Sequence, residues 1–289
     1  MSMPASPTVQ SLFVEAPHAG GRHRIQVRLW KARAPSILPP LICVHGLTRH
    51  GGDFSRLAER LSATRDIYAP DMPGRGGSEA FADSALYNYA QYSADCTALL
   101  AHFNLTRVDW LGTSMGGLIG MMLAAAKDTP LRKLALNDIG PFLPLAAMQR
   151  IGAYVSKEMR FVDFRQAEIY CRQIYTGFGI KSDEDWREFA QSSIRPAEGG
   201  GYRLHYDVGI AKAFLNVTAD VDAWGIYDAI NIPVLLIRGE KSDTLLKETA
   251  EEMTRRGPKA RLVTIAGVGH APALLEEEQI EIVEEFLGN

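Results

Sequence analysis

The sequence has few cysteines, no long apolar run and no large excess of charge of either sign. Its 289 residues include three cysteines that lie far apart, so we expect neither disulfides nor a zinc knuckle. The longest nearly apolar run, residues 115–126, is well short of the ~20 residues that span a bilayer. With 34 acidic and 31 basic side chains, the net charge of -3 creates no global positive field for nucleic acid or an anionic membrane surface.

Signals for targeting, metals and cofactors are also missing. Residues 1–16 have neither a basic segment nor a continuous apolar segment, so nothing there is typical of a secretory signal, and we expect a cytoplasmic protein. There is no Walker loop and no cluster of metal ligands. The glycines at 74, 76 and 77 resemble a dinucleotide loop, but Glu79 stands where a third glycine belongs. We therefore expect no metal and no cofactor.

What the sequence does contain is an alternation of short apolar strands and helices. The residue patterns predict strands at 24–30, 41–45, 67–69, 108–111, 131–136, 234–237 and 262–265. They predict helices at 54–64, 89–103, 115–127, 245–255 and 275–286. This order implies βαβ units, and hence an α/β fold with a mostly parallel sheet and helices on both faces.

Residues 141–227 interrupt this alternation. They indicate helices joined by loops, with no convincing strand, and hold 14 of the 25 aromatic residues of the chain. We interpret them as a helical cap inserted into a core made of residues 1–140 and 228–289. Such an aromatic insertion either covers an apolar pocket or needs the aromatic residues for a core of its own.

The segment Gly112-Thr113-Ser114-Met115-Gly116 fits the pattern G-x-S-x-G and lies between a predicted strand and a predicted helix. In this setting a sharp turn exposes the serine oxygen at the carboxyl edge of the sheet. The small residues allow the strand and helix to approach closely. We therefore predict that Ser114 is a nucleophile, which needs a base and an acid that orients the base.

The partners of such a serine follow it in the chain in the order acid, then histidine. His270 follows the last predicted strand in a glycine-rich loop, and we expect it to be the general base. Asp243 follows the strand at 234–237 and is our first candidate for the acid. Asp138, at the end of the strand before it, is the runner-up.

The remaining requirement is a pair of N–H donors for the oxyanion of the tetrahedral intermediate. We expect these to be the backbone N–H groups of Met115 and Leu47, the latter in the loop that begins His45-Gly46. His45 then serves to fix that loop. Arg49 could contact a substrate carbonyl or carboxylate, although a surface charge that pairs with Asp53 or another neighbour is the favoured interpretation.

With these segments, the sequence resembles the α/β-hydrolase superfamily over nearly its whole length. The matching segments are HGLTRHGGDF (45–54), DMPGRGGS (71–78), GTSMGG (112–117), GEKSD (239–243) and GVGH (267–270). The resemblance implies an eight-stranded sheet with a cap after the sixth strand, and cofactor-free hydrolysis through an acyl-enzyme on Ser114. The chain looks most like bacterial serine carboxylesterases, some of which also attack aliphatic polyesters.

Other functions within this resemblance stay open. A serine nucleophile excludes the branches that use aspartate, namely haloalkane dehalogenases and epoxide hydrolases. Carbon–carbon hydrolases usually have a tryptophan soon after the histidine, whereas His270 is followed by Ala271-Pro272-Ala273. The expected substrate is a small or polymeric carboxylic ester, with no nucleic acid or membrane as a partner. A lactone or carbon–carbon hydrolase and a ligand-binding protein without turnover are the alternatives.

Overall fold

The computed structural model describes residues 9–35, 38–215 and 217–288. Residues 1–8, half of the stretch considered for a secretory signal, lie outside the described residues. Among the described helices, none has both the length and the apolar character that crossing a lipid bilayer requires.

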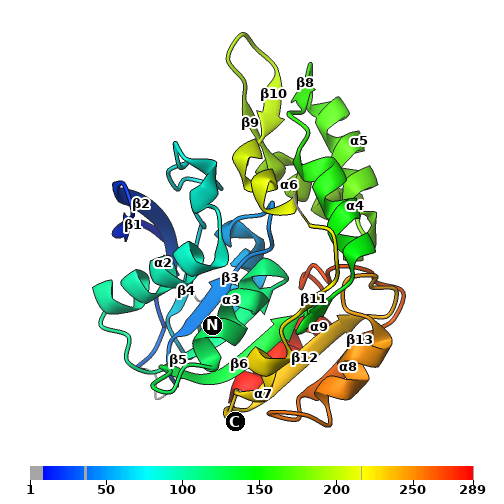
Figure 1. Cartoon of the computed structure of the whole chain (residues 1–289). Coiled ribbons are helices and arrows are strands. Elements are labelled where there is room, and N and C mark those ends of the chain that lie inside the picture. Colours follow the sequence, from blue (N-terminus) through cyan, green and yellow to red (C-terminus); the bar gives the residue numbers. More distant parts are fainter. Residues whose placement is uncertain (1–8, 36–37, 216, 289) are drawn as a thin grey trace, which may run out of the picture.

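A single eight-stranded sheet forms the centre of the molecule (Figure 1). Only the contacts of β2 with its two neighbours are antiparallel, which confirms the expected mostly parallel sheet. In spatial order the strands are β1 (Val9–His18), β2 (Gly21–Trp30), β4 (Ile67–Pro70), β3 (Leu41–Val44), β5 (Val108–Thr113), β6 (Leu131–Asn137), β12 (Val234–Gly239) and β13 (Arg261–Ile265).

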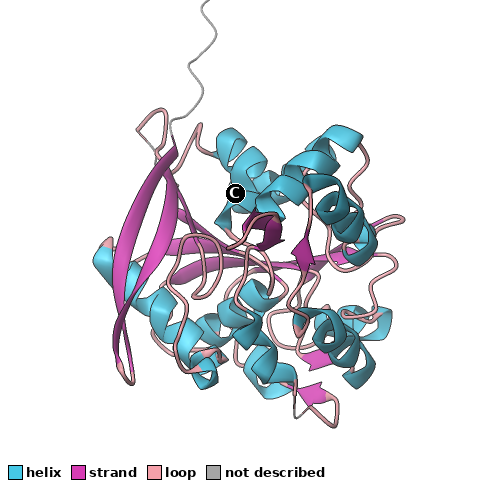
Figure 2. Ribbon diagram, turned by 90° about the horizontal axis from the view of Figure 1, so that it is seen from above, coloured by secondary structure: helices cyan, strands magenta, loops and turns pink. Residues whose placement is uncertain are grey.

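Helices cover both faces of this sheet, and Figure 2 shows the strands as one twisted band between them. The central strands are buried throughout because their side chains enter two separate cores: Val44 and Trp110 point into one, Cys43 and Leu111 into the other. The first core includes α2 (Tyr89–His102), α3 (Met115–Ala124), α7 (Trp224–Asp228) and α8 (Lys247–Met253). The second includes α1 (Ser55–Leu61) and α9 (Glu277–Gly288).

The strand β1 is absent from our sequence-based expectation. It pairs only with β2, at the edge of the sheet, and buries just Val14 and Ala16 fully. The side chain of Phe13, the residue before them, is about half exposed. An edge strand with so few buried positions gives a weak apolar pattern, whereas the predicted strands each contribute to a core.

Residues 141–227, which we call the insertion, lie mainly beyond the carboxyl ends of the central strands (Figure 1), whereas their last residues, in α7, pack in the first core beside the sheet. They are not purely helical as expected, because three strands of two or three residues each form a small antiparallel sheet. Strands this short carry no periodic signal. The boundary between the core and the cap remains a prediction. The elements of the insertion are β7 (Phe142–Leu143), α4 (Leu145–Val155), β8 (Arg160–Phe161), α5 (Phe164–Ile174), η3 (Thr176–Phe178), α6 (Asp183–Ser193), β9 (Ile194–Pro196), β10 (Tyr202–Leu204), η4 (Val208–Phe214) and β11 (Val221–Asp222).

The turn from β5 to α3 depends on glycines because backbone segments approach each other closely there. A Cβ atom at Gly116 would lie 2.0 Å from the carbonyl oxygen of Val44, and one at Gly112 would lie 2.2 Å from the carbonyl oxygen of Gly116. Between them, Ser114 has the positive φ of 48° with ψ of -111°. This conformation is strained for a residue with a side chain, and such strain concentrates at functional sites.

Gly116→Ala is therefore expected to destabilise the fold by at least about 2 kcal/mol, the cost of forcing extra atoms into a packed interior. Gly225→Ala is the matched control, because a Cβ atom there meets nothing within 4 Å and the residue is exposed within α7. This control is expected to be neutral or stabilising by up to about 1 kcal/mol. Urea unfolding of both variants measures the difference. Equal stability of the two would contradict the close approach at Gly116.

Candidate active site

Ser114, His270 and Asp138 form a continuous chain of hydrogen bonds at the carboxyl edge of the sheet. The imidazole Nε2 of His270 is 2.9 Å from Ser114 Oγ, and its Nδ1 is 2.8 Å from Asp138 Oδ2. An ionised carboxylate only accepts hydrogen bonds, so Nδ1 carries a hydrogen and donates a hydrogen bond to Asp138. Nε2 is then free to accept the hydroxyl hydrogen of Ser114, which is the arrangement that activates a serine.

Asp138 directly follows β6, where its own φ is 57° and its side chain is completely buried. Its Oδ1 accepts the backbone N–H of Gly239 at 2.7 Å, and its Oδ2 also accepts the hydroxyl of Ser242 at 2.5 Å. Both donors belong to the end of β12 and the loop after it. These bonds satisfy the buried charge and hold the carboxylate toward His270.

The structure corrects our preference for Asp243 as the partner of His270. Asp243 lies four residues past the end of β12, and its carboxylate extends outward to Arg150 of α4. Although burial opposes it, the hydrogen bond and charge of Arg150 lower the pKa of Asp243. Strand order alone could not separate Asp138 from Asp243, because β6 and β12 are neighbours that end at the same edge.

His270 is held by contacts on both sides of its loop. The N–H of Gly269 donates to Gly177 O at 2.7 Å, and the N–H of Ala273 donates to Phe178 O at 3.1 Å. On the opposite side, the Asn137 amide donates to Pro272 O at 2.8 Å. The loop of His270 is thus attached to the insertion as well as to the sheet.

Leu47 and Met115, the two expected oxyanion donors, flank Ser114 as linings of one cavity. Within the described part of the chain, neither backbone N–H donates to another residue, so both are available to a ligand. Met115 is also the first residue of α3, where the orientation of the peptide dipoles favours negative charge.

Arg75 is a residue of this site that our sequence analysis did not identify. Its side chain is completely buried; Nε donates to Leu47 O at 2.8 Å, and Nη2 is 3.5 Å from the sulfur of Met115. Nη1 donates to Pro73 O and to the hydroxyl of Tyr92. Arg75 therefore fixes both residues that carry the available N–H groups. An arginine within a glycine-rich turn was the only sequence signal for it.

The side chains of His45 and Arg49 form hydrogen bonds with other residues of the protein. His45 donates from Nδ1 to Gly46 O at 2.7 Å and accepts the Met72 N–H at Nε2, so it holds the loop as predicted. Arg49 pairs with Asp53 through two hydrogen bonds of 2.6 and 2.8 Å. This pair was predicted, but it is not on the surface: Arg49 is buried, and its guanidinium lies 3.7 Å from the ring centre of Phe189.

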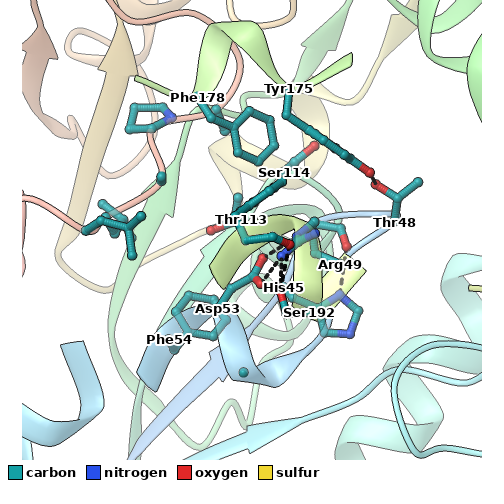
Figure 3. A pocket seen from close by; sticks show the side chains of 18 of the residues that line it. His45, Thr48, Arg49, Asp53, Phe54, Thr113, Ser114, Tyr175, Phe178 and Ser192 are labelled. Atoms are coloured by element: carbon teal, nitrogen blue, oxygen red, sulfur yellow. Dashed lines mark hydrogen bonds and ion pairs between the residues drawn. The ribbon is translucent and has the colours of Figure 1, made fainter. Parts of the chain in front are cut away.

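Two cavities meet at Ser114 and Leu47. The first, of about 460 Å³, is lined by His270 and by charged and aromatic side chains including Arg49, Arg150 and Tyr175; we call it the polar cavity. In Figure 3, Ser114 lies between Phe178 and Tyr175 on one side and Arg49 and Asp53 on the other. The second, of about 690 Å³, is the apolar cavity, lined mainly by aliphatic and sulfur-containing side chains such as Leu118, Met121, Met122 and Ile226.

Comparisons with known proteins concern the chain as a whole rather than the residues of the site. A family model described as alpha/beta hydrolase fold matches residues 39–277. A 3-hydroxybutyrate-oligomer hydrolase from Cupriavidus necator is 41% identical, over 98% of this chain and 99% of that protein. A 2-(acetamidomethylene)succinate hydrolase from Mesorhizobium japonicum is 25% identical, over 80% of this chain and 81% of that protein.

Among solved structures, an alpha/beta hydrolase from Novosphingobium aromaticivorans superimposes with a TM-score of 0.87 at 33% identity. The match covers 97% of this chain and 98% of that one.

His45 makes the stability of the protein depend on pH. Burial lowers the pKa of His45 from 6.5 to about 3. Between these values the unfolded chain binds a proton that the folded chain does not, so stability falls as the pH drops below 6.5. From pH 7 to pH 5, His45 is expected to remove about 2 kcal/mol from the free energy of unfolding.

The measurement is urea unfolding at both pH values for the wild type and for His45→Gln. The variant lacks this titration, so its stability is expected to change less with pH by about that amount. His50, whose pKa burial lowers to about 4, contributes in the same direction in both proteins. An identical pH dependence of the two proteins would show that His45 is not a buried neutral imidazole.

Proposed function

The chain belongs to the α/β-hydrolase fold family, and from this premise we propose that it is a serine-dependent hydrolase of carboxylic esters. The observation that carries the proposal is the hydrogen-bonded chain from Ser114 through His270 to Asp138. It supplies a nucleophile, a general base and an orienting carboxylate within contact of one another. The open N–H groups of Leu47 and Met115 supply the oxyanion donors.

The reaction follows from these positions. Ser114 Oγ attacks the ester carbonyl while His270 Nε2 takes the hydroxyl proton, and Asp138 stabilises the imidazolium through Nδ1. The carbonyl oxygen becomes negative and accepts the two backbone N–H groups. The carbon–oxygen bond to the alcohol then breaks, and His270 returns the proton to the leaving oxygen. Water, deprotonated by the same histidine, attacks the acyl-enzyme and releases the carboxylic acid.

The acyl part and the alcohol part of the substrate bind in different cavities. The leaving oxygen must lie beside His270 to receive the proton, and His270 lines the polar cavity but not the apolar one. The alcohol part therefore occupies the polar cavity. The acyl chain extends past Met115 into the apolar cavity, where burial of its methylene groups supplies binding energy.

For the substrate class we propose short oligomers of hydroxy acids. The support is the relative from Cupriavidus necator, a 3-hydroxybutyrate-oligomer hydrolase at 41% identity over almost the full length of both chains. A chain of ester-linked units also suits a site with one cavity on each side of the nucleophile, because several units bind on both sides of the bond to be cleaved.

Hydrolysis of p-nitrophenyl butyrate separates the roles of the two aspartates. Ser114→Ala is expected to lower kcat by about 10⁶-fold, and Asp138→Asn by about 10⁴-fold because the imidazole loses its orienting carboxylate. Asp243→Asn is the matched control, with the same substitution at the same sheet edge, and is expected to stay within about threefold of the wild type. A loss in Asp243→Asn as large as that expected for Asp138→Asn would reinstate Asp243 as the acid.

A series of p-nitrophenyl esters tests the assignment of the cavities. With acyl chains from acetate upward, kcat/KM is expected to rise about fourfold per methylene until the apolar cavity is full. Ala213→Phe narrows that cavity and should shift the optimum to shorter chains. Ala273→Phe, the same substitution in the polar cavity, should lower the rate equally for every chain length. A shift of the optimum by Ala273→Phe alone would reverse the assignment.

A further inference from the structure

Arg150 lines the polar cavity and forms an ion pair with Asp243 that has no part in the hydrogen-bonded chain of Ser114. Arg150 projects from α4, and Asp243 follows β12. Arg150 Nε is 2.6 Å from Asp243 Oδ2, and Nη2 is 2.8 Å from Oδ1. Both side chains are about half exposed, at 42% and 51%, and Arg150 lines the cavity, so a molecule bound there can reach its guanidinium.

This pairing leaves one end of the guanidinium open. The edge formed by Nε and Nη2 is occupied by Asp243, and Nη2 has a further contact of 3.4 Å with the Thr244 hydroxyl. Among the described residues, none accepts a hydrogen bond from Nη1 of Arg150. A guanidinium has five N–H donors, so the two on Nη1 are left to bind a second carboxylate.

The other arginines that line the polar cavity are already committed. Arg49 uses Nε and Nη2 for Asp53, and it donates from Nη1 to Ser193. Arg56 donates to Asp185 and to the carbonyl oxygen of Leu275. Within the described lining of this cavity, Arg150 is the arginine that has a terminal nitrogen, Nη1, without a hydrogen-bond partner, since both terminal nitrogens of Arg49 and of Arg56 have one.

A substrate built of hydroxy acids presents a matching group. When the last ester bond before the acid end is cleaved, the leaving alcohol is itself a hydroxy acid with a free carboxylate. We propose that Arg150 binds this carboxylate, so that the enzyme removes single hydroxy acid units from the acid end of an oligomer. The inference rests on the proposed ester hydrolysis and adds the direction in which the oligomer is bound.

The chemistry at Ser114 is unchanged by this contact. The carbon–oxygen bond breaks, the leaving oxygen takes its proton from His270, and the carboxylate stays ionised on Arg150 throughout. Asp243 is a positioning residue here, because its two hydrogen bonds fix the plane of the guanidinium. The ion pair with Asp243 keeps the Arg150 side chain at the wall of the cavity.

The test compares the linear dimer of 3-hydroxybutyrate with its terminal carboxamide, which has the same shape without the charge. The wild type is expected to favour the acid by at least about tenfold in kcat/KM, the size of one charge-assisted contact. Arg150→Met should abolish this preference through a higher KM for the acid, with the carboxamide unchanged within about twofold. Lys212→Met is the matched control, since Lys212 lines the apolar cavity, and it should preserve the preference.

Binding of free 3-hydroxybutyrate to Ser114→Ala, measured by calorimetry, separates this inference from the proposed ester hydrolysis. Binding that weakens at least about fivefold in the Ser114→Ala/Arg150→Met double variant supports the carboxylate site even if no ester is turned over. No preference for the acid in the wild type would overturn the inference. An equal loss on the acid and the carboxamide in Arg150→Met would also overturn it, as would binding that does not depend on Arg150.

Discussion

The buried carboxylate of Asp138 is the constraint on which the candidate site depends. It joins the ends of three neighbouring strands: it follows β6 itself, accepts Gly239 and Ser242 from the end of β12, and accepts His270 from the loop after β13. A charge without exposure to water is tolerated only when it is fully hydrogen-bonded. The same bonds that satisfy the charge therefore fix the position of His270, and through it the position of the Ser114 proton.

The parts of the fold that follow from local patterns could be predicted from the sequence. Strands such as Leu41–Val44 are buried on both faces, and the turn at Ser114 requires glycines at fixed positions, so each leaves a strong signal. The order of strands and helices then fixed the α/β class and the edge at which the site lies. The edge strand β1 and the two- and three-residue strands of the insertion leave no comparable signal.

The contact between Ser114 and His270 was predictable from the sequence, whereas the aspartate that contacts His270 was not. Ser114 and His270 each stand in a loop with a distinctive glycine pattern, and the structure places them in contact. Asp138 and Asp243 both follow strands at the same edge, and the choice between them depends on where each side chain points. That direction is set by long-range contacts, with Ser242 and His270 for one carboxylate and Arg150 for the other. The position of Arg75 depends on such contacts as well.

The attachment of the His270 loop to the insertion has a mechanical consequence. Gly269 and Ala273, on either side of His270, donate to the carbonyl groups of Gly177 and Phe178, at η3 of the insertion. A displacement of η3 would pull on the backbone that carries the imidazole and lengthen its contact with Ser114. The position of His270 relative to Ser114 therefore depends on how the insertion packs, as well as on the sheet.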